Sequence, residues 1–207
     1  MKHTLRIGLS MRVTQAPTYP ERRDALAQDW PRYLNRVFPA ARWLYLPNMS
    51  EEITGYIERW ELNAFILTGG ENIGEAPERD RTESAILRHA RERQIPVLGI
   101  CRGLQLIYTH LGGKVTTEEE AFARRHRATT HTIVMGETQH TVNSYHENRL
   151  AEETLPAALE VVARCPADGS IEAVRGERLL GIMWHPERSR EIPAWETTMI
   201  KEFFEKR

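Results

Sequence analysis

The stretch from Pro96 to Gly113, PVLGICRGLQLIYTHLGG, constrains the fold of this chain more than any other. A short apolar run, typical of a buried strand, ends at Cys101, and a pattern typical of a helix begins directly after it. Gly99 and Gly103 stand two positions either side of the cysteine, in the pattern glycine-x-nucleophile-x-glycine that makes a sharp strand-to-helix elbow. Such an elbow predicts a Cys101 thiol above the sheet edge, at a helix N-terminus whose unpaired N–H groups favour the thiolate.

Short apolar runs alternate with helical patterns through the first half of the chain. The strands that we expect there cover residues 5–10, 41–46, 63–70 and 96–100. The helices that we expect there begin at Asp29 and Ser50 as capping residues and then cover residues 79–94 and 102–113. Residues 14–30 begin with prolines and polar side chains, which predicts a long loop leading into the first helix. Strands that alternate with helices favour a parallel sheet.

The second half of the chain has a different pattern, in which turn residues separate the strand-like runs. These runs cover residues 131–135, 140–146, 159–165, 170–176 and 179–184, and a helical pattern follows over 193–207. Consecutive strands joined by short turns indicate antiparallel pairing. We therefore predict one α/β domain over residues 1–207, with an open, mostly parallel sheet covered by helices on both faces and some antiparallel strands in its later half.

The composition excludes several classes of partner. The formal net charge of the 207 residues is −1, which gives no overall attraction toward nucleic acid or a membrane surface. No apolar run approaches the roughly 20 residues that span a bilayer, and the opening segment MKHTLRIGLS lacks the apolar stretch of a signal peptide. Two cysteines are too few for a disulfide framework, so we expect a cytoplasmic protein with free thiols. No glycine-rich phosphate loop or dinucleotide fingerprint is present, so no organic cofactor is expected.

A thiolate nucleophile needs a base and a group that orients the base. In the segment LLGIMWHPE, His185 follows an apolar run and Glu187 comes two residues later, so both are expected at the carboxyl end of a strand. Glu187 can accept a hydrogen bond from one imidazole nitrogen and leave the other facing the Cys101 thiol. Taken alone, this segment fits a surface turn equally well, and a lone Cys101 between glycines fits a buried small side chain.

An acyl-transfer site also needs donors for the developing oxyanion. The segment FILTGGE ends a predicted strand at Gly69 and Gly70, whose lack of a Cβ lets the backbone approach a substrate closely. The N–H groups of Gly70 and of Arg102, which directly follows the cysteine, are the candidates for this oxyanion hole. A plain turn also explains the two glycines.

Three segments occur in order along the chain: Thr-Gly-Gly, then Gly-Ile-Cys-Arg-Gly-Leu-Gln, then Trp-His-Pro-Glu. Together they resemble the class I glutamine amidotransferase superfamily, and the resemblance extends over nearly the whole chain. It implies that Cys101 attacks a γ-glutamyl amide to form a thioester, that His185 transfers the proton and that Glu187 holds His185. The resemblance also implies contacts of the glutamyl group with Gln105, Ser144, Tyr145 and His146.

The Cys-Arg-Gly elbow resembles the γ-glutamyl hydrolase branch of this superfamily, whose members release their product to water. Residues 22–30 and 67–83 are similar to one group in that branch, the γ-glutamyl-CDP-amidate hydrolases of capsule phosphoramidate biosynthesis. This resemblance implies cleavage to glutamate and cytidine diphosphoramidate, and the phosphates of such a substrate need cations. The candidate cations lie in three clusters: Arg22 and Arg23, Arg79 and Arg81, and Arg124, Arg125 and Arg127. A solvated surface is the alternative explanation of each cluster.

Three other roles stay open at this point. The chain could be the glutaminase subunit of an amidotransferase that passes ammonia to a synthase partner, since 207 residues leave no room for a synthase domain. It could instead hydrolyse another γ-glutamyl amine such as γ-glutamyl-γ-aminobutyrate, but the segment after its third strand is shorter than in those hydrolases. A non-catalytic binding role conflicts with an intact Cys101, His185 and Glu187.

Several side chains capable of chemistry are given no catalytic role. His126, His131 and His140 have a spacing that matches no compact ligand pattern, so we expect surface histidines and no metal site. Cys165 lies in a predicted turn with no helix to activate its thiol, and it is expected to be structural. Trp184 is expected to form a wall of the site beside the predicted base.

Overall fold

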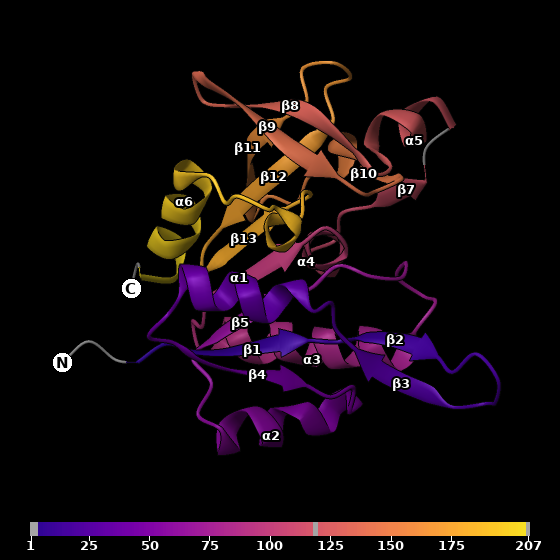
Figure 1. Cartoon of the computed structure of the whole chain (residues 1–207), viewed down its shortest axis with the longest axis vertical. Coiled ribbons are helices and arrows are strands. Elements are labelled where there is room, and N and C mark those ends of the chain that lie inside the picture. Colours follow the sequence, from indigo (N-terminus) through magenta and orange to yellow (C-terminus); the bar gives the residue numbers. More distant parts are fainter. Residues whose placement is uncertain (1–3, 118–119, 206–207) are drawn as a thin grey trace.

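A nine-stranded sheet forms the centre of the structure, a computed structural model that describes residues 4–117 and 120–205 (Figure 1). Its strand order is β4-β1-β5-β6-β13-β12-β11-β8-β9. The parallel strands are β4 (Arg42–Leu46), β1 (Arg6–Ser10), β5 (Ala64–Leu67), β6 (Val97–Ile100) and β13 (Leu179–Ile182). The strands that pair antiparallel are β12 (Ile171–Gly176), β11 (Leu159–Arg164), β8 (Thr129–Met135) and β9 (Thr138–Ser144). The predicted mixture of a parallel first part and an antiparallel later part is confirmed.

Short, fully buried strands explain why helices cover both faces of the sheet. Every residue of β5, β6 and β13 is buried, and such continuous apolar runs are typical of parallel strands between two helical layers. One face packs against α1 (Asp29–Val37) and α6 (Ala194–Glu205). The opposite face packs against α2 (Ile53–Arg59), α3 (Pro77–Glu92) and α4 (Arg102–His110). The predicted helical layers on both faces are therefore confirmed.

Two segments that we expected to be loops contain regular elements. β2 (Arg12–Gln15) and β3 (Arg22–Ala25) form an antiparallel hairpin within the expected long loop. α5 (Glu120–His126) carries Arg124 and Arg125 of the third arginine cluster, in a segment for which we predicted no regular element. Both elements are short, and the hairpin residues are mostly exposed, so no apolar alternation marked them in the sequence.

The starts of two helices differ from their predicted caps. Asp29 is the first residue of α1 rather than its cap, and the capping position, Gln28, makes no side-chain hydrogen bond. Ser50 begins a short 3-10 turn, η1 (Ser50–Glu52), and α2 follows directly from it at Ile53. Residues 1–3, 118–119 and 206–207 of the predicted domain lie outside the described residues, and the last two belong to the predicted last helix.

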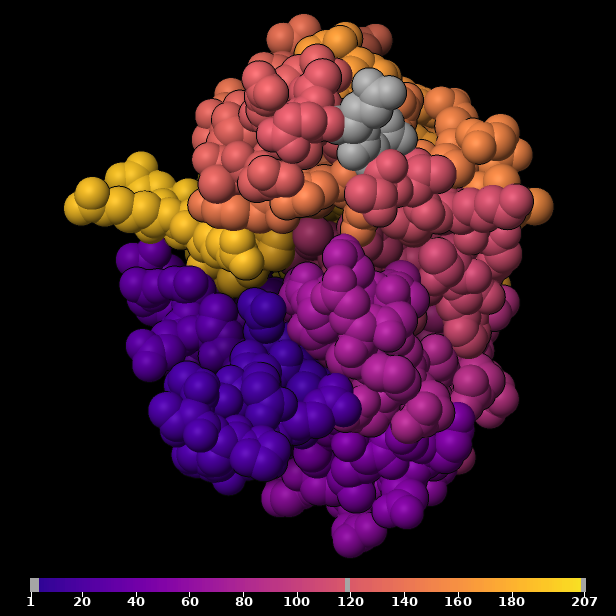
Figure 2. Space-filling model, turned by 90° about the vertical axis from the view of Figure 1, so that its right-hand side faces the viewer, coloured from indigo at the N-terminus to yellow at the C-terminus, as the bar shows by residue number. Residues whose placement is uncertain are grey.

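The carboxyl ends of the parallel strands meet at one edge of the sheet, and the β2–β3 hairpin and α4 begin there (Figure 1). A small sheet of β7 (Val115–Thr117) and β10 (Asn148–Leu150) lies near the same edge, and the remaining turns are η2 (Glu152–Thr154) and η3 (Pro186–Arg188). Figure 2 views this side: the indigo N-terminal part lies below the salmon and orange later strands, with yellow C-terminal residues between them. Within the ranges that the structure describes, none of the helices has the length and apolar character needed to cross a bilayer.

Candidate active site

Cys101 lies at a strained corner between β6 and α4. Its backbone has φ of 50° and ψ of −104°, a conformation unfavourable for a residue with a side chain, and α4 begins at the next residue. The flanking glycines allow a close crossing, because a Cβ on Gly99 would lie 2.6 Å from the carbonyl carbon of Gly103. A Cβ on Gly103 would collide with the carbonyl oxygen of Leu67 on β5. The predicted elbow is therefore present, with the cysteine at the N-terminus of α4.

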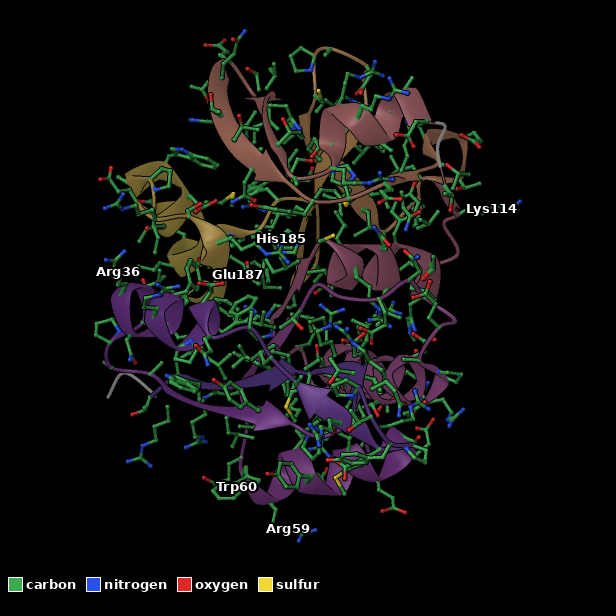
Figure 3. The ribbon with its side chains drawn as sticks, turned by 45° about the vertical axis from the view of Figure 1, so that its right-hand side comes forward. Arg36, Arg59, Trp60, Lys114, His185 and Glu187 are labelled. Atoms are coloured by element: carbon green, nitrogen blue, oxygen red, sulfur yellow. The ribbon has the colours of Figure 1, made fainter. Side chains whose placement is uncertain are left out.

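His185 and Glu187 reach Cys101 because β13 is the parallel neighbour of β6. The two strands pair with Ile182 opposite Ile100, so the residues that follow them emerge side by side. The Cys101 thiol interacts electrostatically with the His185 ring, and His185 Nδ1 lies 2.8 Å from Glu187 Oε1. Figure 3 shows both labelled side chains on the C-terminal segment between α1 and the later strands. The structure thus brings together the residues predicted as nucleophile, base and orienting carboxylate.

Burial and charge together set the protonation of His185, which is 2% exposed. Burial opposes a charged ring, but the negative charge of Glu187, the interaction with Cys101 and the hydrogen bond to Glu187 outweigh it. They raise the pKa of His185 to about 9. His185 can therefore hold a proton near neutral pH and deliver it to a leaving group.

A side-chain amide from β9 fixes the backbone of His185, a contact that we did not predict. Asn143 Nδ2 donates to the His185 carbonyl oxygen over 2.7 Å, and the His185 backbone N–H donates to Asn143 Oδ1 over 2.8 Å. The Tyr145 ring packs edge-on against the imidazole, with 5.5 Å between ring centroids, and the Arg188 guanidinium lies 4.2 Å from the Tyr145 centroid. The signal available in the sequence was the position of Asn143 directly before the predicted substrate-binding segment.

The predicted oxyanion loop, Gly69–Gly70, follows β5 and lies against the base. A Cβ on Gly69 would lie 2.5 Å from Cε1 of His185, so the approach requires glycine. Thr68 anchors the loop to β1: its backbone N–H donates to Ser10 Oγ over 3.0 Å, and its hydroxyl donates to the Ser10 carbonyl oxygen over 2.9 Å. The loop is therefore held in place before any substrate binds.

Arg79 supports this loop rather than facing a substrate. Its side chain is fully buried, and its Nη2 donates to the carbonyl oxygen of Thr68 over 2.7 Å. Its guanidinium also pairs with Glu71 at 3.1 Å and with Glu83 at 3.0 Å. Burial disfavours the charge of Glu83, but the charges of Arg102 and Arg79 outweigh it and lower the pKa of that carboxyl. The expectation that Arg79 binds a substrate phosphate is therefore corrected, because its charge is enclosed and already neutralised by two carboxylates.

A cavity of about 250 Å³ opens beside the nucleophile. The predicted site residues that line it are Gly70, Cys101, Arg102, Gln105, Tyr145 and His146. The lining residues that we did not predict are Glu71, Asn72, Glu75, Thr117, Glu147 and Asn148. Their position in the sequence could have indicated them, since most of them directly follow either the oxyanion glycines or the predicted glutamyl-binding segment. The cavity is thus polar and contains several carboxylates.

Ser144 and Trp184, which we expected at the substrate, do not line this cavity. Ser144 is fully buried, and its hydroxyl lies 3.4 Å from His126 Nδ1. Trp184 is also buried, and its indole N–H donates to Glu196 over 2.5 Å instead of forming a wall of the cavity. Successive residues of a strand face opposite sides, so Ser144 and Tyr145 cannot both face the substrate. Both expectations are corrected accordingly.

The arginines expected to bind phosphates have acidic partners. Arg22 pairs with Glu78, and Arg23 lies 2.5 Å from Glu21, on the half-exposed β2–β3 hairpin. Arg125, from the mid-chain cluster, lies 3.3 Å from an aspartate carboxylate. The cavity lining contains none of these side chains. Their role toward a substrate therefore stays a prediction.

Two histidines expected at the surface lie inside the molecule. His126 is fully buried, and the His131 side chain is 10% exposed. They lie beside His146, whose pKa burial lowers to about 4, and beside Glu172. The expectation was wrong because α5 was not predicted, and this helix carries His126 into the interior. Ring nitrogens and carboxylate oxygens of His126, His146 and Glu172 lie within 4.8 Å of one another, so this group could hold a metal ion.

The sequence of the chain matches known hydrolases over most of its length. Residues 7–187 match the peptidase C26 family. The γ-glutamyl-CDP-amidate hydrolase of Campylobacter jejuni is 30% identical, and the match covers 96% of each chain. The γ-glutamyl-γ-aminobutyrate hydrolase PuuD of Escherichia coli is also 30% identical, over 79% of this chain and 70% of the relative.

Solved structures show the same fold at lower sequence identity. A protein from Thermoplasma acidophilum, assigned as a GMP synthase subunit, superposes with a TM-score of 0.72 at 18% identity, covering 99% of this chain and 94% of the other. A glutamine amidotransferase from Thermotoga maritima superposes with a TM-score of 0.64 at 15% identity, covering 89% and 77%. These likenesses support the predicted class I glutamine amidotransferase-like architecture.

Proposed function

Because the chain belongs to the peptidase C26 family, we propose that it hydrolyses a γ-glutamyl amide through a thioester on Cys101. The observation that carries this proposal is the sequence of contacts from a thiol that lines a polar cavity to an imidazole and from the imidazole to a carboxylate. A nucleophile, a base within hydrogen-bond reach and a group that orients the base are the three parts that covalent catalysis requires.

The reaction proceeds in two halves. His185 takes the proton of the Cys101 thiol as the sulfur attacks the γ-carbonyl carbon, and the backbone N–H groups of Gly70 and Arg102 stabilise the oxyanion. His185 gives its proton to the leaving nitrogen, the C–N bond breaks and a γ-glutamyl thioester remains on Cys101. A water molecule then attacks the thioester while His185 takes its proton, and glutamate leaves as the thiol re-forms. Glu187 keeps the ring oriented and stabilises its charge throughout.

The cavity suits the glutamyl part of such a substrate. Its lining includes the carboxylates of Glu71, Glu75 and Glu147, which can attract an α-ammonium group. Asn148 lies at its floor, where its Nδ2 donates to Asn72 over 2.8 Å and to Gln105 over 3.5 Å. These amides can hold the α-carboxylate of the glutamyl group.

For the leaving group, we propose the amidate of cytidine diphosphate, as in capsule phosphoramidate biosynthesis. The match to the relative with that activity covers 96% of both chains. The match to the aminobutyrate hydrolase covers only 70% of that relative. Arg188 lies over the Tyr145 ring and 3.7 Å from Glu187, so it can supply a cation near the base. Arg22 and Arg23 remain candidates on the hairpin.

We also propose that residues 1–207 act as one catalytic domain without a cofactor in the reaction, in a reducing compartment such as the cytoplasm. A reducing compartment keeps the thiol of Cys101 free for nucleophilic attack. Both cysteines of the chain are free.

The experiment that tests this function compares glutamate release from three substrates: L-glutamine, γ-glutamyl-γ-aminobutyrate and γ-glutamyl-CDP-amidate. Each assay is paired with the Cys101→Ala variant. A kcat/KM at least tenfold higher for the nucleotide conjugate supports the proposal. Equal rates for simple γ-glutamyl amines would retain the hydrolase and reject the nucleotide substrate. Turnover of glutamine alone, rising with a synthase partner, would instead identify a glutaminase subunit.

A further inference from the structure

A second group of buried polar side chains lies on the inner side of the cavity. Its members are His126 on α5, His131 on β8, His146 after β9 and Glu172 on β12, and we refer to them as the histidine cluster. His126 and Glu172 are fully buried, His146 is 4% exposed and the His131 side chain is 10% exposed. The proposed hydrolysis uses none of these groups for proton transfer.

The cluster contains more lone pairs than hydrogen-bond donors to meet them. Glu172 Oε1 lies 3.9 Å from His126 Nδ1 and 3.8 Å from His146 Nε2. Glu172 Oε2 lies 3.3 Å from His131 Nε2. Among the described residues, both ring nitrogens of His131, Nε2 of His146 and Oε2 of Glu172 lack a hydrogen-bond partner. Buried polar atoms in native proteins are rarely left in that state.

These separations fit the ligand shell of a tetrahedral metal ion. Zinc binds imidazole nitrogen and carboxylate oxygen at about 2.0–2.2 Å, so two ligands of one ion lie about 3.3–3.5 Å apart. The separations of 3.8 and 3.9 Å between Glu172 Oε1 and the ring nitrogens of His146 and His126 reach that range with inward movements of a few tenths of an ångström.

Groups around the cluster already orient two of its histidines as metal ligands. Asp168 Oδ2 lies 2.9 Å from His126 Nε2, and a carboxylate there places the proton on Nε2 and leaves Nδ1 as a lone pair. The backbone carbonyl oxygen of Asn148 lies 2.9 Å from His146 Nδ1, which leaves Nε2 free in the same way. In both rings the nitrogen that faces Glu172 is therefore the one able to bind a metal.

We propose that His126, His146 and Glu172 form a binding site for a divalent transition metal such as Zn²⁺. Two imidazoles and one carboxylate suit zinc rather than calcium or magnesium, which prefer oxygen ligands. His131 lies 3.3 Å from the second carboxylate oxygen of Glu172 and does not belong to this group of ligand atoms. The ion joins α5 and β12 to the segment that carries His146, and it thereby fixes one wall of the substrate cavity.

A neighbouring group competes for the same histidine. Cys165, Asp168 and His126 also place ligand atoms within 4.8 Å of one another. Asp168 already accepts from Ser170 over 2.8 Å and pairs with Arg125 at 3.3 Å, so its oxygens are largely satisfied. The histidine cluster has the unpartnered atoms, and we therefore place the metal there.

The test measures the zinc content of the purified protein. The protein is expressed without an affinity tag in zinc-supplemented medium. The variants carry Cys101→Ala as background, because a thiol and imidazole at the active site could bind zinc themselves. By mass spectrometry of the metals, we expect about one zinc per chain in the wild type and in the background variant. Adding His146→Gln or Glu172→Gln should lower the content to below about one tenth.

Two matched controls locate the ion. His89→Gln removes a buried histidine of α3 outside the cluster, and Cys165→Ala removes the competing thiol. Both should keep the zinc. Loss of zinc in Cys165→Ala alone would overturn the placement, and a wild type without zinc would overturn the site itself.

A second measurement does not depend on the folding of any variant. Wild-type chain stripped with a chelator is titrated with Co²⁺, and its melting temperature is followed with added Zn²⁺. We expect the intense visible absorption of tetrahedral Co²⁺ and a melting temperature raised by several degrees. Weak octahedral-type absorption together with an unchanged melting temperature would contradict the proposal. Neither readout requires hydrolytic activity, so failure of the proposed function leaves this test intact.

Discussion

Two regions of this molecule bury histidines, and they differ in what the ring nitrogens contact. At the edge of the sheet, His185 has the Cys101 thiol on one nitrogen and Glu187 on the other. In the histidine cluster, nitrogens of three rings face a single carboxylate, and several have no hydrogen-bond partner in the described part of the chain. An imidazole between a thiol and a carboxylate moves a proton, whereas converging lone pairs can hold a metal ion. The partners, and not the residue type, decide the chemistry.

The largest effect in this comparison is expected from removing the active-site partners. Cys101→Ala and His185→Ala should each lower kcat/KM at least about 10⁴-fold, because such residues act as a unit and their losses do not add. His89→Gln, which removes a buried histidine from neither region, should leave the rate unchanged. Steady-state glutamate release measures all three. Near-normal turnover by Cys101→Ala would show that Cys101 is not the nucleophile and that His185 does not act as its base.

Buried ion pairs of Arg79 support the active-site region, and breaking them should have a large effect on the free energy of unfolding. Arg79→Met removes one of the two buried cations beside Glu83, leaves Glu71 with the half-exposed Arg12 and removes one anchor of the Gly69–Gly70 loop. We expect the free energy of unfolding to fall by about 3–5 kcal/mol. Urea unfolding followed by circular dichroism provides the measurement.

An exposed ion pair supplies the control for that measurement. Arg88 lies 2.5 Å from Glu51, and both side chains are about half exposed or more. Arg88→Met should change the free energy of unfolding by no more than about 0.5 kcal/mol, since solvent screens this pair. Equal effects of the two substitutions would show that the buried network is not the main support of the loop.

The pH dependence of stability should separate the proton-binding histidine from the others. The pKa of His185 is raised to about 9 in the folded chain, so folding favours its protonated form. Its contribution is fully present below the unfolded pKa of about 6.5 and is lost as the pH rises toward 9, on the order of 1–3 kcal/mol.

The Glu187→Gln variant tests the origin of that contribution. It removes the main charge that raises the pKa of His185, so its free energy of unfolding should fall less than that of the wild type between pH 6.5 and 9. Unfolding titrations at several pH values give this difference. Parallel curves for the two proteins would show that His185 does not bind a proton more tightly on folding.

The smallest effect is expected from the amide that holds the backbone of His185. Asn143→Ala removes two hydrogen bonds of 2.7 and 2.8 Å without touching a ring nitrogen. We expect kcat to fall about tenfold through misplacement of the base. KM should change less than twofold, and kcat is expressed per folded chain, counted by titration of the Cys101 thiol, so that a loss of folded protein does not lower it. An unchanged kcat would show that β13 alone positions His185.

The sequence was most informative where chemistry and backbone geometry coincide. The elbow at Cys101 needs glycines on both sides, so its pattern predicted both the turn and the nucleophile. His185 and Glu187 follow a buried strand, and parallel topology then brought them to the same edge. By contrast, Arg79 and the exposed arginines look alike in sequence, because burial depends on contacts with Glu71 and Glu83 from distant or helical positions.

The histidine cluster shows why other parts could not be predicted. His126 lies on a short helix without a clear apolar period, and Glu172 lies 46 positions later, on β12. Their proximity arises from sheet pairing between β8, β11 and β12, which no local pattern encodes. Ser144 was misplaced for a related reason, since the side it faces depends on the register of β9.

The central claim is that Cys101 is an activated nucleophile for a glutamyl group, and the second cysteine offers an internal control. Cys165 is buried, and burial raises the pKa of its thiol. The most direct measurement treats the chain with a glutamyl-directed electrophile, 6-diazo-5-oxo-L-norleucine, and maps the label by peptide mass spectrometry. We predict stoichiometric labelling of Cys101, protection by substrate and no label on Cys165. Hydrolytic activity that survives with Cys101 unlabelled, or equal labelling of both cysteines, would contradict the account.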